Sequence, residues 1–239
     1  MSDNGVILEL RRVVRRVEAK TIIDDLSAQF RKGRIYSVIG PSGAGKSSLL
    51  RLVNRLDEIG SGEIRFHGLD IRELPPTRLR CRIGYLFQTP YLFPGTVRDN
   101  FFSAACARTE ETAARLADLV QLEAALIDAD TEPLSLGQKQ RVALGRLLAT
   151  EPEIALLDEP TSALDPTITE AIERTVMDIV RRTGLTVIWV THHPDQALRL
   201  GGETLLLVQG RLVESGPSDE VINRPQTDLG RRYRARELR

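Results

Sequence analysis

Two short stretches of the sequence have the composition of phosphate-binding sites, and the first is GPSGAGKS at residues 40–47. It has the spacing of a P-loop and lies between a predicted strand and a predicted helix. Its glycines let backbone N–H groups surround phosphate oxygens, Lys46 supplies a positive charge for the outer phosphates, and Ser47 supplies a hydroxyl for Mg²⁺. The residues expected to contact a phosphate chain are Gly40, Pro41, Ser42, Gly43, Ala44, Gly45, Lys46, Ser47 and Ser48.

The second stretch is LSLGQKQRVALGRLLA at residues 134–149. Ser135 is a candidate N-cap, Gly137 lets a backbone N–H come close to a ligand, and an amphipathic run follows from Gln140. The first turn of a helix has unpaired N–H groups and the positive end of the helix dipole, so it also suits phosphate. The sequence therefore contains two phosphate-type sites, and the second needs an explanation.

Side chains able to hold a metal or activate water follow the ends of predicted strands. Asp158 and Glu159 close the apolar strand EIALLDEP; the first suits hydrated Mg²⁺ and the second suits a general base for water. His192 closes the strand TVIWVTHH, where it is placed to donate to a γ-phosphate. Gln88 follows the strand RIGYLF and faces the same edge of the sheet. The alternatives for these last two are a packed structural histidine and an ordinary polar loop residue, and no role is assigned to His193.

Composition narrows the function classes. The chain has 33 Lys and Arg against 33 Asp and Glu, so it lacks the basic excess of a general nucleic-acid binder. Its 2 cysteines, Cys81 and Cys106, have no metal-ligand spacing and favour a reducing compartment. With no secretory signal and no run of about 18 apolar residues, a cytoplasmic protein is expected. We expect the basic end, RRYRARELR, to be solvated and frayed, with a headgroup or partner contact as the alternative.

The pattern of elements predicts an α/β fold with a helical insertion. Strands are expected at 6–10, 21–30, 35–40, 61–68, 82–87, 153–160 and 186–193, with RKG at 31–33 as a hairpin turn and a second hairpin around Gln209-Gly210. Helices are expected at 47–56, 109–120 and 167–182. We divide the single domain into a β-rich part with the P-loop, a helical part, the remaining core and a basic tail, at residues 1–87, 88–140, 141–222 and 223–239.

Taken together, these motifs resemble those of the ATP-binding subunit of an ABC transporter, from about residue 6 to residue 222. GPSGAGKS resembles the Walker A motif, LSLGQ the signature LSGGQ, IALLDEP the Walker B motif with its catalytic glutamate, and SALD the D-loop that ends at Asp165. Gln88 resembles the Q-loop glutamine and His192 the switch histidine. The resemblance implies a P-loop NTPase core with an antiparallel β-subdomain and an inserted α-helical subdomain.

The chain departs from the family pattern at two positions. The family usually has an aromatic near residue 17, on which adenine stacks, and here the segment RRVEAK offers Val17. Arg15 or Arg16 is a candidate substitute; without one, we expect weak discrimination between ATP and GTP. Leu136 stands where a glycine is usual, while the rest of LSLGQ keeps the phosphate-facing atoms.

The resemblance also explains the second phosphate-type site. It implies a homodimer in which two chains pack head to tail, each ATP lying between one P-loop and the partner's signature helix. Ser135, Gly137, Gln138 and Asp165 would then serve the nucleotide across the interface. Glu159, His192, Gln88 and Lys46 are expected to act in hydrolysis, and Mg²⁺ is expected on Ser47, Gln88 and Asp158.

The resemblance implies a second partner, an integral membrane transporter subunit that docks near the Q-loop and the helical part. The chain would then lie on the inner face of the cell membrane. LLRLVNRL and LSLGQKQRVAL look like a branch containing iron-export-type and aluminium-tolerance ATPases, with phosphate-import ATPases more distant. Two alternatives stay open: a soluble ABC ATPase that moves no solute, as in assembly or remodelling, and a nucleotide-binding scaffold that does not hydrolyse.

Overall fold

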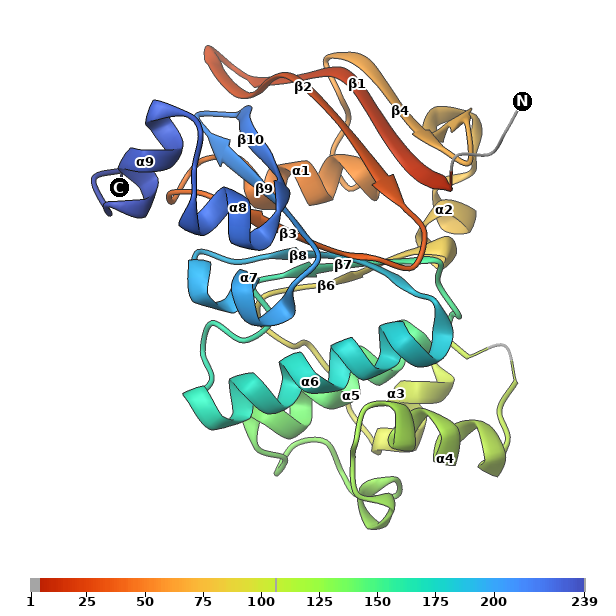
Figure 1. The fold of residues 1–239 in the computed structure, drawn as a ribbon. Coiled ribbons are helices and arrows are strands. Elements are labelled where there is room, and N and C mark those ends of the chain that lie inside the picture. The colour runs from red at the N-terminus through yellow and green to blue at the C-terminus, as the bar shows by residue number, and fades with distance from the viewer. Residues whose placement is uncertain (1–4, 106, 239) are drawn as a thin grey trace.

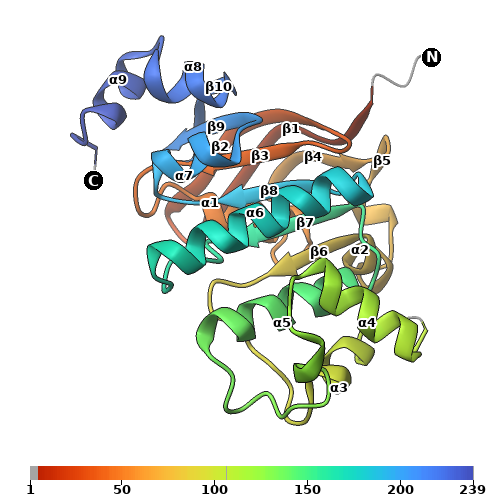
Figure 2. The same cartoon turned by 60° about the horizontal axis from the view of Figure 1, so that its bottom comes forward.

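The computed structural model of the chain describes residues 5–105 and 107–238, so the expectation for Cys106 lies outside it. Two sheets stand in separate layers, one above the other in Figure 1. The upper sheet is antiparallel in the strand order β2-β1-β4-β5, and the larger sheet has the order β10-β9-β3-β8-β7-β6. A helical region lies below the larger sheet (Figure 2).

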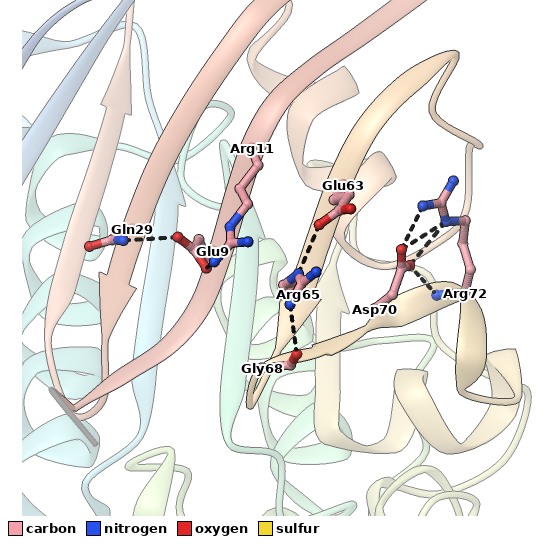
Figure 3. Close-up of polar contacts among 8 residues, drawn as sticks. All are labelled: Glu9, Arg11, Gln29, Glu63, Arg65, Gly68, Asp70 and Arg72. Atoms are coloured by element: carbon pink, nitrogen blue, oxygen red, sulfur yellow. Dashed lines mark hydrogen bonds and ion pairs between the residues drawn. The ribbon is translucent and has the colours of Figure 1, made fainter. Parts of the chain in front are cut away.

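The antiparallel sheet contains β1 (Val6–Val17), β2 (Lys20–Arg31), β4 (Ser61–Phe66) and β5 (Leu69–Asp70). Alternate residues of a strand point to opposite faces, and Leu8 and Leu10 of β1 are fully buried on the inner face. The outer face carries ion pairs instead, among them Glu9 with Arg11 and Glu63 with Arg65 (Figure 3). Such exposed pairs contribute about 0–1 kcal/mol each, so the buried face holds this sheet in place.

The larger sheet contains β3 (Ile35–Ile39), β6 (Ile83–Leu86), β7 (Ile154–Asp158), β8 (Thr186–Val190), β9 (Glu203–Val208) and β10 (Arg211–Pro217). Its strands are parallel except for β10. β7 and β8 are buried throughout, as expected for continuous apolar runs inside a parallel sheet. The carboxyl ends of β3, β7 and β8 therefore meet at one edge, where ligands bind in open α/β sheets.

The helices are α1 (Lys46–Val53), α2 (Pro76–Arg82), α3 (Val97–Phe102), α4 (Glu110–Leu119), α5 (Leu136–Leu148), α6 (Pro166–Thr183), α7 (Pro194–Leu200), α8 (Ser218–Asn223) and α9 (Asp228–Arg234). Two 3₁₀ turns lie at Ile71–Glu73 and Ala124–Leu126. The predicted stripe of α4 is buried, from Ala113 to Val120. Among the described residues, no helix is both long and apolar enough to cross a membrane.

Three details of the predicted elements were wrong. RKG is not a hairpin turn, because β2 and β3 on either side of it belong to different sheets. The first hairpin instead joins β1 to β2, and β1 extends to Val17 rather than ending at residue 10. Leu56 lies beyond the end of α1 and is half-buried rather than part of its buried stripe.

The expectation of a frayed C-terminus was also wrong. Residues 228–234 form α9, which packs beside β10 and α8 (Figures 1 and 2). Leu229 and Tyr233, one helical turn apart, lie on a buried cluster that includes Ile39 and Leu206. The many arginines of RRYRARELR concealed this apolar pair, which holds the segment to the core.

Candidate functional site

The P-loop owes its shape to glycines that have no room for a side chain. A Cβ on Gly40, whose φ is 150°, would lie 2.0 Å from the carbonyl oxygen of Leu207. A Cβ on Gly45, whose φ is 97°, would lie 2.7 Å from the carbonyl oxygen of Ile22. The loop backbone therefore rests directly on β9 and β2. It leads into α1, which begins at Lys46 and directs its unpaired N–H groups at the loop.

A cleft of about 1100 Å³ opens at this edge of the sheet. The predicted phosphate-contacting residues, 40–48, all line it, and so do Glu159 and His192. Segments distant in the sequence complete the walls: Lys20 and Ile22 of β2, residues 193–195, residues 221–223 and part of the C-terminal segment. The structure thus brings together the P-loop, the end of β7 and the end of β8.

Lys46 lies at the base of the loop. Its Nζ donates to the carbonyl oxygens of Gly40 and Pro41, both at 2.9 Å, and its side chain is buried. Burial lowers the pKa of Lys46, while the charges of Glu159 and Asp158 act in the opposite direction. The ammonium group therefore lies within the loop, between backbone carbonyls and two carboxylates, where a phosphate would provide a stronger partner.

Asp158 is held by two hydroxyl donors. Ser47 Oγ donates to Asp158 Oδ1 at 2.8 Å, and Tyr85 Oη donates to Asp158 Oδ2 at 2.8 Å. Burial, followed by the charge of Asp158, raises the pKa of Tyr85, so the phenol keeps its proton and remains a donor. Sequence reasoning missed Tyr85. The available signal was its position in β6, because β6 pairs with β7 and a residue near its end faces the same edge.

Ser47 and Asp158 fit a hard divalent cation. Their oxygens lie within one hydrogen bond of each other beside the P-loop, and Mg²⁺ prefers one or two such ligands together with substrate phosphates. No group of three or more His, Cys, Asp or Glu side chains converges within the described ranges. The donor set matches a cation held between the protein and a phosphate chain rather than an all-protein cage.

Glu159 and His192 form a contact pair on the cleft wall. His192 Nδ1 lies 2.9 Å from Glu159 Oε2, and Glu159 has a left-handed backbone with a φ of 46°. A non-glycine residue in this conformation is strained, and such strain is often found where a side chain must be aimed. The ring of His193 stacks against His192 with centroids 3.9 Å apart, and it also lines the cleft. Burial, followed by the charge of His192, lowers the pKa of His193.

A hydrogen-bonded network around the buried Glu173 connects the segments that carry Glu159 and His192. Glu173 of α6 accepts two hydrogen bonds from Arg199 of α7, both at 2.7 Å. Gln196 donates to the same carboxylate at 2.8 Å and to Thr161, two residues after Glu159, at 2.9 Å. The loop after β7 and the helix after His192 are therefore fixed to one another. Sequence reasoning did not predict this network, because its members lie on separate elements.

Gln88 lies outside the cleft lining. Its Nε2 donates to Ser162 Oγ at 3.0 Å, which joins the segment after β6 to the loop after β7. Phe87, Tyr91 and Phe93, all within five residues of Gln88 in the chain, are exposed aromatic side chains. In the described structure Gln88 thus bridges two loops and does not touch Asp158.

The signature segment begins α5, away from the chain's own cleft. Ser135 is the N-cap, as predicted, and forms a capping box with Gln138: Gln138 N donates to Ser135 Oγ at 3.3 Å, and Ser135 N donates to Gln138 Oε1 at 2.9 Å. Gly137 has a packing role as well, because a Cβ would lie 2.8 Å from Ile168 Cγ2 of α6. Leu136 is exposed. None of these four residues is among those that line the cleft of the described chain.

The remaining predicted nucleotide contacts also lie outside the cleft. Asp165 caps α6, where its Oδ1 accepts from Ile168 N at 3.0 Å. Val17 ends β1 with 46% of its surface exposed, and the cleft is lined by Lys20 and Ile22 of β2 instead. The structure therefore divides the predicted site residues into one group around the P-loop and another on separate faces.

Comparison with known proteins finds one family across the core of the chain. A family model described as ABC transporter matches residues 23–162. The glycine betaine uptake system ATP-binding protein YehX of Escherichia coli (strain K12) is 38% identical over 95% of this chain and 76% of its own length. Protein STAR1 of Oryza sativa subsp. japonica is 39% identical over 96% of this chain and 68% of its own length.

Solved structures with this fold are cassettes of the same kind. The chain cbiO1 from Clostridium perfringens, part of the ABC transporter complex cbiONQ, superposes with a TM-score of 0.84 at 26% identity, covering 98% of this chain and all of that one. The dimeric bacterial ABC transporter cassette MJ0796 superposes with a TM-score of 0.78 at 28% identity, covering 89% of this chain and 99% of that one. MJ0796 is also known in a post-hydrolysis dimer with ADP and Pi. The predicted fold class is therefore confirmed.

The contact between Tyr85 and Asp158 predicts an effect of Tyr85→Phe. The change leaves Asp158 Oδ2 without its donor while the ring keeps its packing, so the free energy of unfolding is expected to fall by about 1–2 kcal/mol. Urea unfolding followed by circular dichroism measures this. Tyr91→Phe, on an exposed ring, is the matched control and is expected to change stability by less than about 0.5 kcal/mol. Equal stability of Tyr85→Phe and the unaltered chain would show that the contact contributes nothing.

Proposed function

The chain belongs to the ABC transporter family of ATP-binding proteins, and from this premise we propose the roles of its individual residues. It is the ATP-hydrolysing subunit of such a transporter, the motor that drives movement of a solute. The observation that carries our assignment of residues is the convergence of the P-loop, Glu159 and His192 on one cleft.

In the proposed mechanism, backbone N–H groups of residues 40–48 and the ammonium of Lys46 bind the phosphates of ATP. Glu159 takes a proton from the attacking water, and its Oε2 is held 2.9 Å from His192 Nδ1. His192 lines the same cleft as Glu159, which supports a proposed contact of its ring with the γ-phosphate. The network beneath keeps both side chains aimed at the same point.

Mg²⁺ is proposed to be held by Ser47, Asp158 and, after movement of its loop, Gln88. When bound, it neutralises charge that develops on the phosphates. Ser47 and Asp158 already lie 2.8 Å apart, and Tyr85 fixes the second carboxylate oxygen. The protein's contribution is therefore a pair of oxygens oriented in advance by a neighbouring strand.

A dimer accounts for the residues that lie away from the cleft. Likeness to a dimeric cassette supports dimerisation, and we propose that two chains meet head to tail with one ATP in each interface. Ser135, Gly137 and Gln138 begin α5 at an exposed helix N-terminus, which suits the phosphates of the partner's nucleotide. Asp165 at the start of α6 is proposed to reach the same interface.

A membrane partner is supported by the family and by the transporter complex that contains cbiO1. We propose that it docks on the aromatic surface defined by Phe87, Tyr91 and Phe93, which are 53%, 68% and 45% exposed. The three residues belong to the same segment of the chain as Gln88, so a helix docked on them would move with the loop proposed to reach the nucleotide site. This partner would hold the chain on the inner face of the cell membrane.

We propose membership of the branch of iron-export-type and aluminium-tolerance ATPases on the likeness to protein STAR1. The E. coli uptake protein is nearly as similar, at 38% against 39%, so the proposal includes no direction of transport and no solute. A soluble ABC ATPase that moves no solute is the second candidate. The exposed aromatic surface favours the transporter subunit over it.

Removal of the proposed base gives the first test. Glu159→Gln keeps the shape of the side chain but cannot accept the proton, so ATP turnover is expected to fall by roughly 10²–10⁴-fold. Gel filtration with ATP is expected to show a stable dimer of this variant. Glu170→Gln, on an exposed face of α6, is the control. Turnover of Glu159→Gln within a few-fold of the unaltered chain would place the base elsewhere.

Complementation tests the head-to-tail arrangement. Lys46→Ala and Ser135→Arg damage different halves of each site, so each variant alone is expected to be inactive. In a mixed dimer both changes fall in one site and the other site is intact, so ATPase activity is expected to return on mixing. Crosslinking verifies that mixed dimers form. Mixed dimers that form but do not hydrolyse ATP would contradict the proposal that the two chains share each site and that one intact site is enough for turnover.

Co-purification tests the membrane partner. The chain, produced with a candidate membrane transporter subunit from the same organism, is expected to elute with that subunit in detergent. Tyr91→Ala is expected to reduce the recovered complex severalfold, since exposed aromatic anchors dominate such contacts. Leu69→Ala removes another exposed apolar side chain, in the antiparallel sheet, and is the control. An unchanged yield with Tyr91→Ala would refute this docking surface.

A further inference from the structure

The C-terminal arm, defined as residues 228–238, supplies part of the nucleotide cleft. Lys20, Lys46, Arg234 and Arg236 line the cleft as cations, whereas Glu159 and Asp195 are its carboxylates. Half of these cations therefore come from the arm, which sequence reasoning expected to be frayed. An excess of positive charge at the walls of a cleft attracts anions.

The arm is held in place before any ligand arrives. Thr227 caps α9, with Oγ1 accepting from Gly230 N at 3.0 Å, and Glu214 of β10 accepts from Thr227 Oγ1 at 2.8 Å and from Gln226 N at 2.8 Å. Apolar side chains of the arm pack on Ile39, the residue before the P-loop. A wall that is already ordered loses little conformational entropy when a ligand binds.

Tyr233 is an unusual feature of this wall. Its hydroxyl is buried beside the backbone N–H of Gly40, the first residue of the P-loop, and its O–H has no acceptor among the described residues. Burial raises the pKa of Tyr233 to about 12, so the phenol remains protonated and can donate. Tyr233 therefore fixes the arm directly against the start of the P-loop.

The two arginines of the wall differ in how they are held. Arg234 Nη1 donates to the carbonyl oxygen of Asn223 and so fixes α9 to the end of α8. Arg236 follows the helix with a left-handed φ of 59°, and its side chain has no hydrogen bond or ion pair to any described residue. Arg232 lines no part of the cleft and pairs with Glu237 at 3.6 Å.

We propose that Arg236 binds the phosphate chain of the nucleotide held by the protein's own P-loop, against a fixed wall formed by Tyr233 and Arg234. The inference rests on the proposed function, since it requires nucleotide in this cleft. A guanidinium group has a planar set of donors that matches phosphate oxygens, and it stays charged at all relevant pH values. Arg236 thereby adds to the P-loop a cation from the opposite end of the chain.

Calorimetric titration of the full chain in magnesium-free buffer tests this, with ATP and inorganic tripolyphosphate as the two ligands. Arg236→Ala is expected to raise the Kd for both ligands by about three- to tenfold, as for the loss of one partly solvated charged contact. Arg236→Lys is expected to recover part of the loss, and the loss is expected to shrink as salt is raised. Arg232→Ala is the matched control and is expected to stay within about twofold of the unaltered chain.

Three results would overturn the inference. If Arg236→Ala and Arg232→Ala have equal Kd values, Arg236 makes no contact with the phosphates. A loss with ATP but not with tripolyphosphate would move the contact from the phosphates to the base or ribose. Tighter binding by Arg236→Ala would make the arm an obstruction to the cleft.

Lys46→Ala, titrated in parallel, separates this inference from the proposed function. If Lys46→Ala loses ATP binding and Arg236→Ala does not, only the role of the arm fails. If Lys46→Ala binds ATP as well as the unaltered chain, the assignment of the cleft itself fails.

Discussion

The hydrogen bond between Ser47 and Asp158 joins the first turn of α1 to the end of β7, and the remaining geometry of the site depends on it. It places the P-loop, whose backbone packs closely on neighbouring strands at Gly40 and Gly45, beside the two acidic residues at the end of a buried strand. Glu159 comes next in the chain, so its position follows from that of Asp158. Through Glu159 the arrangement extends to His192 at the end of β8.

Under the proposed function, the site is completed by a second chain. The helix N-terminus at Ser135 begins α5 and is not among the residues that line the chain's own cleft. The N-terminus of α5 suits a phosphate, but it does not face the cleft of its own chain. Its ligand would therefore be a phosphate bound by another molecule. In the proposed dimer, closure around ATP would be transmitted to the aromatic surface through Gln88, whose hydrogen bond to Ser162 joins the segment after β6 to the loop after β7.

The sequence was most informative where chemistry is local. The P-loop, the end of β7 and the cap of α5 each depend on residues close in the chain, so spacing and turn chemistry predicted them. Tyr85 could not be predicted in this way, because its role depends on lateral pairing of β6 with β7, whose residues lie about 70 positions apart. The assignment of RKG to a hairpin failed for a related reason. It assumed that the strands on either side pair with each other, whereas β2 and β3 belong to different sheets.

The C-terminal segment shows how composition misleads. Its arginines predicted a solvated tail, yet Leu229 and Tyr233, four residues apart, were the available signal of a helix with one buried face.

A crystal structure with a non-hydrolysable ATP analogue tests whether two chains share each nucleotide site. We expect the γ-phosphate at about 3 Å, within hydrogen-bond distance, of Ser135 of the partner subunit. A γ-phosphate that contacts only the chain whose P-loop holds it, with that serine in solvent, would rule out the shared site.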